Sequence, residues 1–210
     1  MKGLFAPDSA LIIILTKIFD IILLSLLWFV CCLPIVTIGT STTALYSVTL
    51  KMTKNAEGGI TRSFFLAFKQ NFTKTLPMTC SMIITLTIIG CDVFFLGANE
   101  NIKDICLASG IILLFLWFVV YGYVYPITAK YENTIKNTFV NAFKLAIIHP
   151  FRTVGIAAMN AAPLILAFVS LDIFLRAVPL LIIAGGGFIA YVNSYTLNSI
   201  FDKLAANNNE

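Results

Sequence analysis

The sequence is poor in charged residues, which make up 11% of its 210 positions, while 59% are hydrophobic. A soluble domain carries about a quarter of its residues as charged side chains, because its surface faces water. The mean hydropathy is +0.93, and the apolar residues form runs as long as a bilayer is thick. These features exclude a soluble globular domain and predict an integral membrane protein.

The residues of common catalytic and metal sites are also scarce. His149 is the single histidine, and the five cysteines form no C-x-x-C pair, so zinc or iron–sulfur ligation has no basis. The sequence contains no phosphate-binding loop, no G-x-S-x-G elbow and no H-E-x-x-H helix. We therefore expect no enzyme, no catalytic residues, and no metal or cofactor. Nucleic-acid binding is not expected either, because the net charge of +4 follows from membrane topology.

The first apolar stretch, from about Leu11 to Val36, is too long for a signal peptide and has no small-x-small cleavage site. Two arrangements are open after Pro34 and Gly39. Either one bent helix continues to about Lys51, or the span ends near Pro34 and a short interfacial helix follows. The second is favoured, because Lys51 and Lys54 then lie at the cytoplasmic surface.

Five segments are apolar enough and long enough to cross a bilayer as helices. The predicted spans are residues 18–38 (with an apolar stretch before it), 75–96, 105–126, 153–171 and 178–197. The predicted fold class is an all-α, polytopic membrane helix bundle of about five transmembrane helices. Two or three interfacial amphipathic helices and a weak parallel internal repeat complete it, and residues 1–210 form a single membrane domain.

The basic residues predict the orientation of the spans. Nine of the fourteen lie in two connections, between spans one and two and between spans three and four. By the positive-inside rule these connections are cytoplasmic. With five spans, the N-terminus is then expected outside the cell and the C-terminus in the cytoplasm.

Both basic connections contain an amphipathic helix with an aromatic apolar face, at Arg62–Phe72 and at Ile135–Ile147. Such helices either lie in the lipid interface or dock a cytoplasmic partner. The candidate docking residues are Arg62, Lys69, Lys74, Lys136, Lys144 and Arg152.

The two amphipathic segments also resemble each other. Phe64-x-x-Ala-Phe-Lys69 matches Phe139-x-x-Ala-Phe-Lys144 at an offset of 75 residues, and two spans follow each copy. The chain therefore divides into a leading span, residues 11–38, and two repeat units, residues 61–130 and 135–200. Because each unit contains two crossings, the repeat is parallel.

The run Leu33-Pro-Ile-Val-Thr-Ile-Gly39, the Thr-Thr-Ala-Leu-Tyr sequence at 42–46 and the Phe64–Phe72 element resemble the YesL family of bacterial integral membrane proteins. That family has no established activity and no catalytic residues to carry over. Its members are often encoded beside carbohydrate ABC importers. The resemblance therefore implies a bacterial cell membrane protein, and suggests the permease or ATPase subunits of an importer as partners.

Two asparagines, Asn160 and Asn193, lie deep in the fourth and fifth spans, and Gly185–Gly187 interrupts the fifth. An asparagine at such depth bonds a neighbouring helix or contacts a substrate, and the glycines allow either close helix packing or a broken helix. Two functions follow. The leading one is a non-enzymatic accessory or regulatory subunit of carbohydrate ABC import. The alternative is a small-solute transporter or channel-like homo-oligomer.

Overall fold

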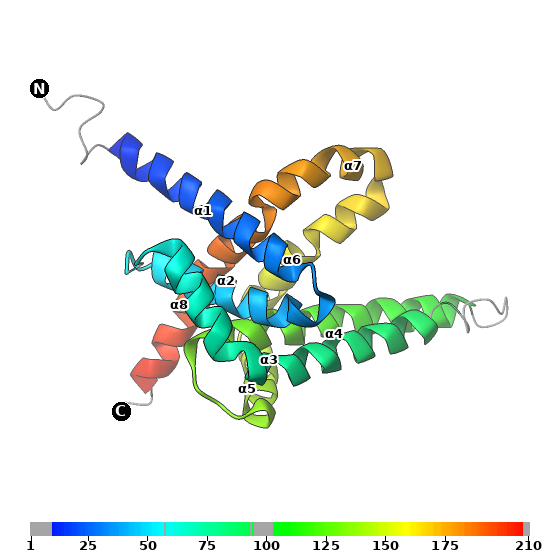
Figure 1. Cartoon of the computed structure of the whole chain (residues 1–210). Helices are drawn as coiled ribbons and strands as arrows, with labels where there is room; N and C mark the ends of the chain where they lie inside the picture. The colour runs from blue at the N-terminus through cyan, green and yellow to red at the C-terminus, as the bar shows by residue number, and fades with distance from the viewer. Residues whose placement is uncertain (1–9, 57, 93, 95–102, 208–210) are drawn as a thin grey trace, which may run out of the picture.

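The computed structural model describes residues 10–56, 58–92, 94 and 103–207, and the elements within these ranges are all helical. In chain order they are α1 (Ala10–Cys32), the 3-10 turn η1 (Ile35–Thr37), α2 (Ile38–Met52), α3 (Ile60–Cys91), α4 (Lys103–Lys130), α5 (Ile135–Ile148), α6 (Pro150–Val169), α7 (Leu171–Leu180), the π-helical segment η3 (Leu181–Gly185) and α8 (Gly186–Asn207). The expected all-α class is confirmed. Figure 1 shows α3 with α4, and α6 with α7, as two hairpins that extend from a common centre.

Five helical stretches in the described part of the chain are long and apolar enough to cross a membrane: Leu11–Cys32, Ile60–Cys91, Asp104–Lys130, Pro150–Ala167 and Leu171–Leu204. Large apolar side chains are exposed along them, for example Ile111 at 67% and Val169 at 75%. Such surfaces are stable only against acyl chains. The chain is a multi-pass membrane protein.

The first break in the helices lies where the sequence predicts it. Helix α1 ends at Cys32, because Pro34 cannot donate a helical hydrogen bond and disfavours helix in the residue before it. Thr37 closes the turn by donating its hydroxyl to the carbonyl oxygen of Cys31 at 2.6 Å. Helix α2 then follows, but it is not interfacial: it is among the most buried elements described, packed against α1, α3, α4 and α8.

The amphipathic helix predicted at residues 62–72 is not a separate element. It continues without a break through Pro77 into the second span as the single helix α3. Its aromatic face also divides, because Phe64 is fully buried whereas Phe65 is 48% exposed. Helix α3 packs against α2, and just beyond this stretch Thr40 and Thr75 hydrogen-bond each other at 2.6 Å in the buried interface. The predicted end of this span at residue 96 lies outside the described residues.

The outer turn predicted at residues 172–177 is helical instead. Ser170 alone separates α6 from α7, and its hydroxyl caps α7 by accepting from the backbone N–H of Ile173. From Leu171 the chain stays helical to Asn207, with a π-helical turn at residues 181–185. The fifth span is therefore longer than predicted and begins earlier.

Helices α1 and α2 form an antiparallel pair. Near the turn, the indole N–H of Trp28 donates to the hydroxyl of Thr42 at 3.2 Å. Far from the turn, the ammonium of Lys17 donates to the side-chain oxygen of Asn55 at 2.6 Å. The start of α1 thus lies at the same end of the molecule as the end of α2.

Helix α8 runs parallel to α2. Ser194 donates to Thr49 at 2.8 Å, and further along, Asp202 pairs with Lys54 at 2.7 Å. Lys130, the last residue of α4, lies 3.6 Å from the same carboxylate. One end of the molecule, here called the basic end, therefore gathers the Lys17 turn of α1 and the C-terminal ends of α2, α4 and α8.

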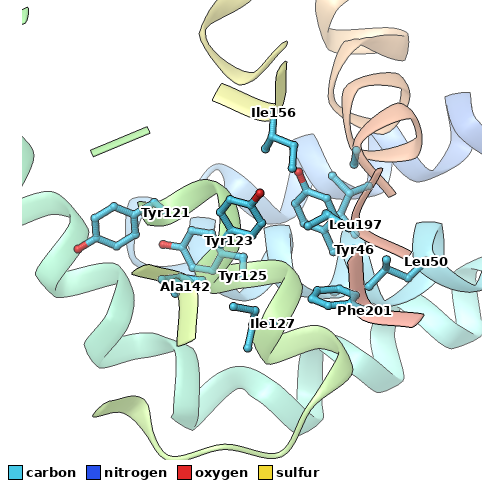
Figure 2. Packing of buried hydrophobic residues seen from close by; sticks show 14 of the residues in the cluster. Tyr46, Leu50, Tyr121, Tyr123, Tyr125, Ile127, Ala142, Ile156, Leu197 and Phe201 are labelled. Atoms are coloured by element: carbon cyan, nitrogen blue, oxygen red, sulfur yellow. The ribbon is translucent and has the colours of Figure 1, made fainter. Parts of the chain in front are cut away.

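The core lies where these helices cross. Figure 2 shows Tyr46 of α2, Leu197 and Phe201 of α8, and Tyr123 and Tyr125 of α4 within one buried cluster. Each of these side chains is less than 5% exposed. The core thus surrounds α2 and supports the candidate site described next.

Candidate functional site: an intramembrane cavity

A cavity of about 460 Å³ lies between α1, α2, α6 and the continuous α7–η3–α8 stretch. We call it the main cavity. Its walls are mostly aliphatic and aromatic, and they include Phe29, Leu45, Pro163, Phe174, Val178, Leu181, Ile182, Gly185, Ile189 and Ala190. A volume of this size and an apolar lining are typical of small-molecule sites.

A small group of neutral polar side chains lies on one side of the main cavity. Trp28, Thr42, Tyr46 and Asn160 line it there. Asn193, 2% exposed, lies behind them and donates to the Tyr46 hydroxyl at 3.3 Å and to the Asn160 side-chain oxygen at 3.1 Å. Because the Tyr46 oxygen accepts from Asn193, its own O–H remains available as a donor. The cavity therefore offers a few fixed hydrogen-bonding groups in an apolar surround.

The wall formed by η3 departs from regular helix. Pro179 removes a backbone donor in α7, and the π-helical turn follows it directly. Single π-turns of this kind often occur at functional sites. Gly185, in this turn, lines the main cavity, and the three atoms nearest to a Cβ added to it belong to the side chain of Leu181 in its own helix.

The other two glycines of the triplet allow α1 to pack closely. A Cβ on Gly186 would lie 2.5 Å from the Trp28 ring, and one on Gly187 would lie 2.5 Å from the Ser25 hydroxyl oxygen. The same Ser25 oxygen accepts from the backbone N–H of Gly187 at 2.8 Å. Close packing thus explains Gly186 and Gly187, whereas the helix is not broken at the triplet and only changes from a π-helical turn to α-helix after Gly185.

The two asparagines selected from the sequence are brought together by the fold. Asn160 of α6 lines the main cavity, and Asn193 of α8 holds it in place. Sequence reasoning missed Trp28, Thr42 and Tyr46. Their one available signal was their position around the Leu33–Gly39 turn, because a turn between two helices brings its flanking residues close together.

The six candidate docking residues do not contribute to this site. Their side chains are exposed or half-buried: exposed at Arg62, Lys69, Lys136 and Lys144, and half-buried at Lys74 and Arg152. The predicted apolar face of α5 divides: Phe139 packs edge-on against Tyr121 of α4 and Ala146 is buried, whereas Val140, Phe143 and Ile147 are exposed. Its exposed apolar surface is suited to lipid or to a partner.

The fold defines a class: a polytopic α-helical membrane protein, with an apolar cavity of about 460 Å³ between its helices. Residues 21–93, about a third of the chain, match a protein family described as "Protein of unknown function, DUF624". The matched segment begins within α1 and extends just past the end of α3, so it includes Trp28, Thr42 and Tyr46. No curated protein and no solved structure matches the chain.

Proposed function

We propose that this protein binds a small, neutral amphiphile in the main cavity, taken from the surrounding membrane. The observation that carries the proposal is the chemistry of the lining: a large apolar wall with the Tyr46 and Asn160 side chains on one side. This is the arrangement of a site that encloses an apolar body and orients one polar group.

The same lining restricts the charge and the number of polar groups that a bound ligand can have. Among the residues that the structure describes, the lining includes no lysine, arginine, aspartate, glutamate or histidine, and an unpaired charge in such surroundings would be very costly. A free sugar would leave most of its hydroxyls without partners, each at a cost of about 1–3 kcal/mol. The geometry therefore favours a ligand with one or two hydroxyl or carbonyl groups and a hydrocarbon body.

The proposal is tested with a fluorescent residue already in the cavity. The chain has two tryptophans, so the Trp117→Phe variant leaves Trp28 as the single fluorophore. In lipid nanodiscs, bromoundecanol should quench Trp28 with a saturable dependence on its concentration in the lipid. Bromoundecane, which lacks the hydroxyl, should bind about fivefold more weakly, the loss expected for one hydrogen bond of about 1 kcal/mol.

Two further variants distinguish quenching of Trp28 by probe bound in the cavity from quenching by collisions with probe dissolved in the lipid. Gly185→Leu places a side chain in the cavity and should remove the saturable quenching. Gly155→Leu, the control, makes the same change at an exposed position with no atom within 4 Å of the added Cβ, and it should bind as before. Quenching that is linear in probe, and equal in both variants, would refute the proposed site.

We also propose an orientation that keeps the basic connections and the C-terminus in the cytoplasm, as the positive-inside rule predicts. The start of α1 then belongs on the cytoplasmic side too, instead of outside, because Lys17 bonds Asn55 at the basic end. The turn between α1 and α2 exposes Leu33 at 67% and Ile35 at 64%. Such a turn is stable inside the lipid, so α1 and α2 would form a re-entrant hairpin.

Single cysteines in a cysteine-free background test this orientation in intact cells. Ala10→Cys and Asn207→Cys should both resist an impermeant maleimide until the membrane is permeabilised, whereas Asp172→Cys should react at once. If Ala10→Cys is labelled from outside while Asn207→Cys is protected, the two ends lie on opposite sides of the membrane. That result would refute the re-entrant hairpin and support five crossings.

The accessory role in carbohydrate ABC import is a second candidate, supported by the exposed Lys69 and Lys144 and by the resemblance to the YesL family. That resemblance includes the Leu33–Gly39 run, which lies within the matched residues 21–93. If the role is correct, importer permease or ATPase subunits should co-purify with the tagged protein and be released by Lys69→Glu with Lys144→Glu. Unchanged co-purification of the double variant would exclude these lysines as the interface.

A further inference from the structure

Arg152, in the first turn of α6, carries a charge that the described part of the chain does not neutralise. Its Nη1 atom is buried without a hydrogen-bond partner, and its Nε and Nη2 atoms, which are not buried, have no partner among the described residues either. The ion pairs that the structure describes all use Asp202, with Lys54 and Lys130. A half-buried guanidinium without a counter-charge is costly, so a negative group from outside the chain would stabilise it.

The backbone around Arg152 is held firmly by the next residue. The buried hydroxyl of Thr153 donates to the Ala146 carbonyl oxygen of α5 at 3.1 Å and is bonded to the Tyr123 hydroxyl of α4 at 3.0 Å. The first turn of α6 is therefore fixed against both neighbouring helices. Arg152 stands on a rigid base at the junction of α5 and α6, which we call the α5–α6 corner.

The α5–α6 corner has an excess of positive charge. His149 connects the two helices, and its pKa is lowered by desolvation and by the positive charges of Arg152 and Lys203. Lys203 belongs to α8, which packs against α6. Its neighbour Asp202 is already paired with Lys54 at 2.7 Å. The corner therefore attracts an anion.

The surface next to Arg152 is apolar. Phe151 is 93% exposed, and Ile147 and Ile148 at the end of α5 are exposed at 63% and 60%. A small soluble anion would leave these side chains uncovered, whereas the acyl chains of a lipid would bury them. An unpaired guanidinium beside exposed apolar side chains matches an anionic phospholipid, which has a phosphate and hydrocarbon chains in one molecule.

We propose that the α5–α6 corner binds one anionic phospholipid of the membrane, with its phosphate on Arg152 and its chains against Phe151. The accessible Nε and Nη2 atoms form the planar fork that suits two phosphate oxygens. With the basic connections in the cytoplasm, this lipid belongs to the cytoplasmic leaflet, where anionic lipids attract basic segments. The main cavity is lined by other residues, so this site and the proposed function can fail independently.

Native mass spectrometry tests the site, with protein released from micelles that contain equal amounts of phosphatidylglycerol and phosphatidylcholine. The parent protein should retain phosphatidylglycerol in preference, because the cation of phosphatidylcholine offsets the charge of its phosphate. Arg152→Gln should lower this retention about tenfold, the factor for one charge-assisted hydrogen bond of about 1.5 kcal/mol. Arg176→Gln, the control, makes the same change at an exposed arginine of α7 and should retain the lipid like the parent.

Thermal unfolding distinguishes loss of the lipid from loss of the fold. In phosphatidylcholine alone, Arg152→Gln should be at least as stable as the parent, because the substitution removes an unneutralised charge. Added phosphatidylglycerol should raise the unfolding temperature of the parent and of Arg176→Gln, but not that of Arg152→Gln. A variant that is less stable in phosphatidylcholine alone would show that Arg152 is needed by the fold itself, and would refute the premise.

Glycerol 3-phosphate distinguishes a lipid from a soluble phosphate ester, since it has the phosphate without acyl chains. At millimolar concentration it should leave phosphatidylglycerol bound; displacement of the lipid would overturn the assignment to a lipid. Equal retention of the two lipids by the parent would refute the site. Equal retention of phosphatidylglycerol by the parent and Arg152→Gln would refute it as well.

Discussion

Replacement of Asn193 by leucine should destabilise the protein and also weaken ligand binding, although Asn193 does not itself line the cavity. The asparagine donates two hydrogen bonds between helices, to Tyr46 of α2 and Asn160 of α6. In membrane proteins one such bond contributes about 0.6 kcal/mol on average and up to about 1.7 kcal/mol. Since leucine has the same branched shape, the main loss is that of the two hydrogen bonds, about 1–3 kcal/mol in the free energy of unfolding.

The effect on binding should exceed what this loss of stability explains. Without Asn193, the Tyr46 hydroxyl and the Asn160 amide are no longer held toward the cavity, so their hydrogen bonds to a ligand become weaker. We expect the affinity for bromoundecanol to fall about fivefold, equivalent to one hydrogen bond of about 1 kcal/mol. Unfolding in mixed detergent micelles and Trp28 quenching in nanodiscs measure the two quantities separately.

Asn198 provides the matched control on the same helix. It donates two interhelical hydrogen bonds, to the Leu50 carbonyl at 2.9 Å and to the Thr53 hydroxyl at 2.7 Å, away from the cavity lining. Asn198 also accepts from the Lys130 ammonium at 3.5 Å, so Asn198→Leu should cost at least as much stability as Asn193→Leu and leave the affinity unchanged. If both variants bind equally well, or lose affinity equally, Asn193 has only a structural role and the reasoning about the site is wrong.

Three further substitutions test the packing. Gly187→Leu should sharply reduce folded yield, because its Cβ would lie 2.6 Å from the Ile21 backbone oxygen, whereas size-exclusion profiles of Gly155→Leu should match the parent. Gly39→Ala should lower the free energy of unfolding by about 1–3 kcal/mol, since a methyl group there overlaps the side chain of Thr79; an unchanged detergent midpoint would contradict this contact. Asp202→Asn should cost at most about 1 kcal/mol, and less at high salt, because its ion pair is exposed; a larger loss would indicate an energetic role that the structure does not explain.

Local sequence patterns predicted helix boundaries correctly where the residues of a single segment determine them. The break near Pro34 follows from the chemistry of proline, and α5 ends within one residue of its predicted boundary because its periodicity is unambiguous. The predicted separation of α3 into two helices was wrong, since packing of α3 against α2 keeps it continuous through Pro77. The buried face of α5 was predicted only in part: Phe139 and Ala146 pack inward as expected, whereas Phe143 is exposed and the small Ala142 is buried instead.

The candidate site could be predicted only in part, because contacts between different helices assemble it. Asn160 and Asn193 are visible in the sequence because an amide is unusual in an apolar span. Tyr46 is not, since tyrosines are common near membrane surfaces, and its role depends on the parallel packing of α2 and α8. That packing, like the antiparallel pairing of α1 with α2, follows from contacts between segments far apart in the chain.

The most direct test of the central claim is mass spectrometry of the lipid extract from protein purified in mild detergent, with Gly185→Leu and Gly155→Leu purified in parallel. A neutral amphiphile with one or two hydroxyl or carbonyl groups should accompany the parent protein and Gly155→Leu in near-equal molar ratio, and should be depleted from Gly185→Leu. Identical extracts from all three proteins, with no such compound enriched over the bulk membrane lipid, would contradict the proposal that the cavity is a binding site.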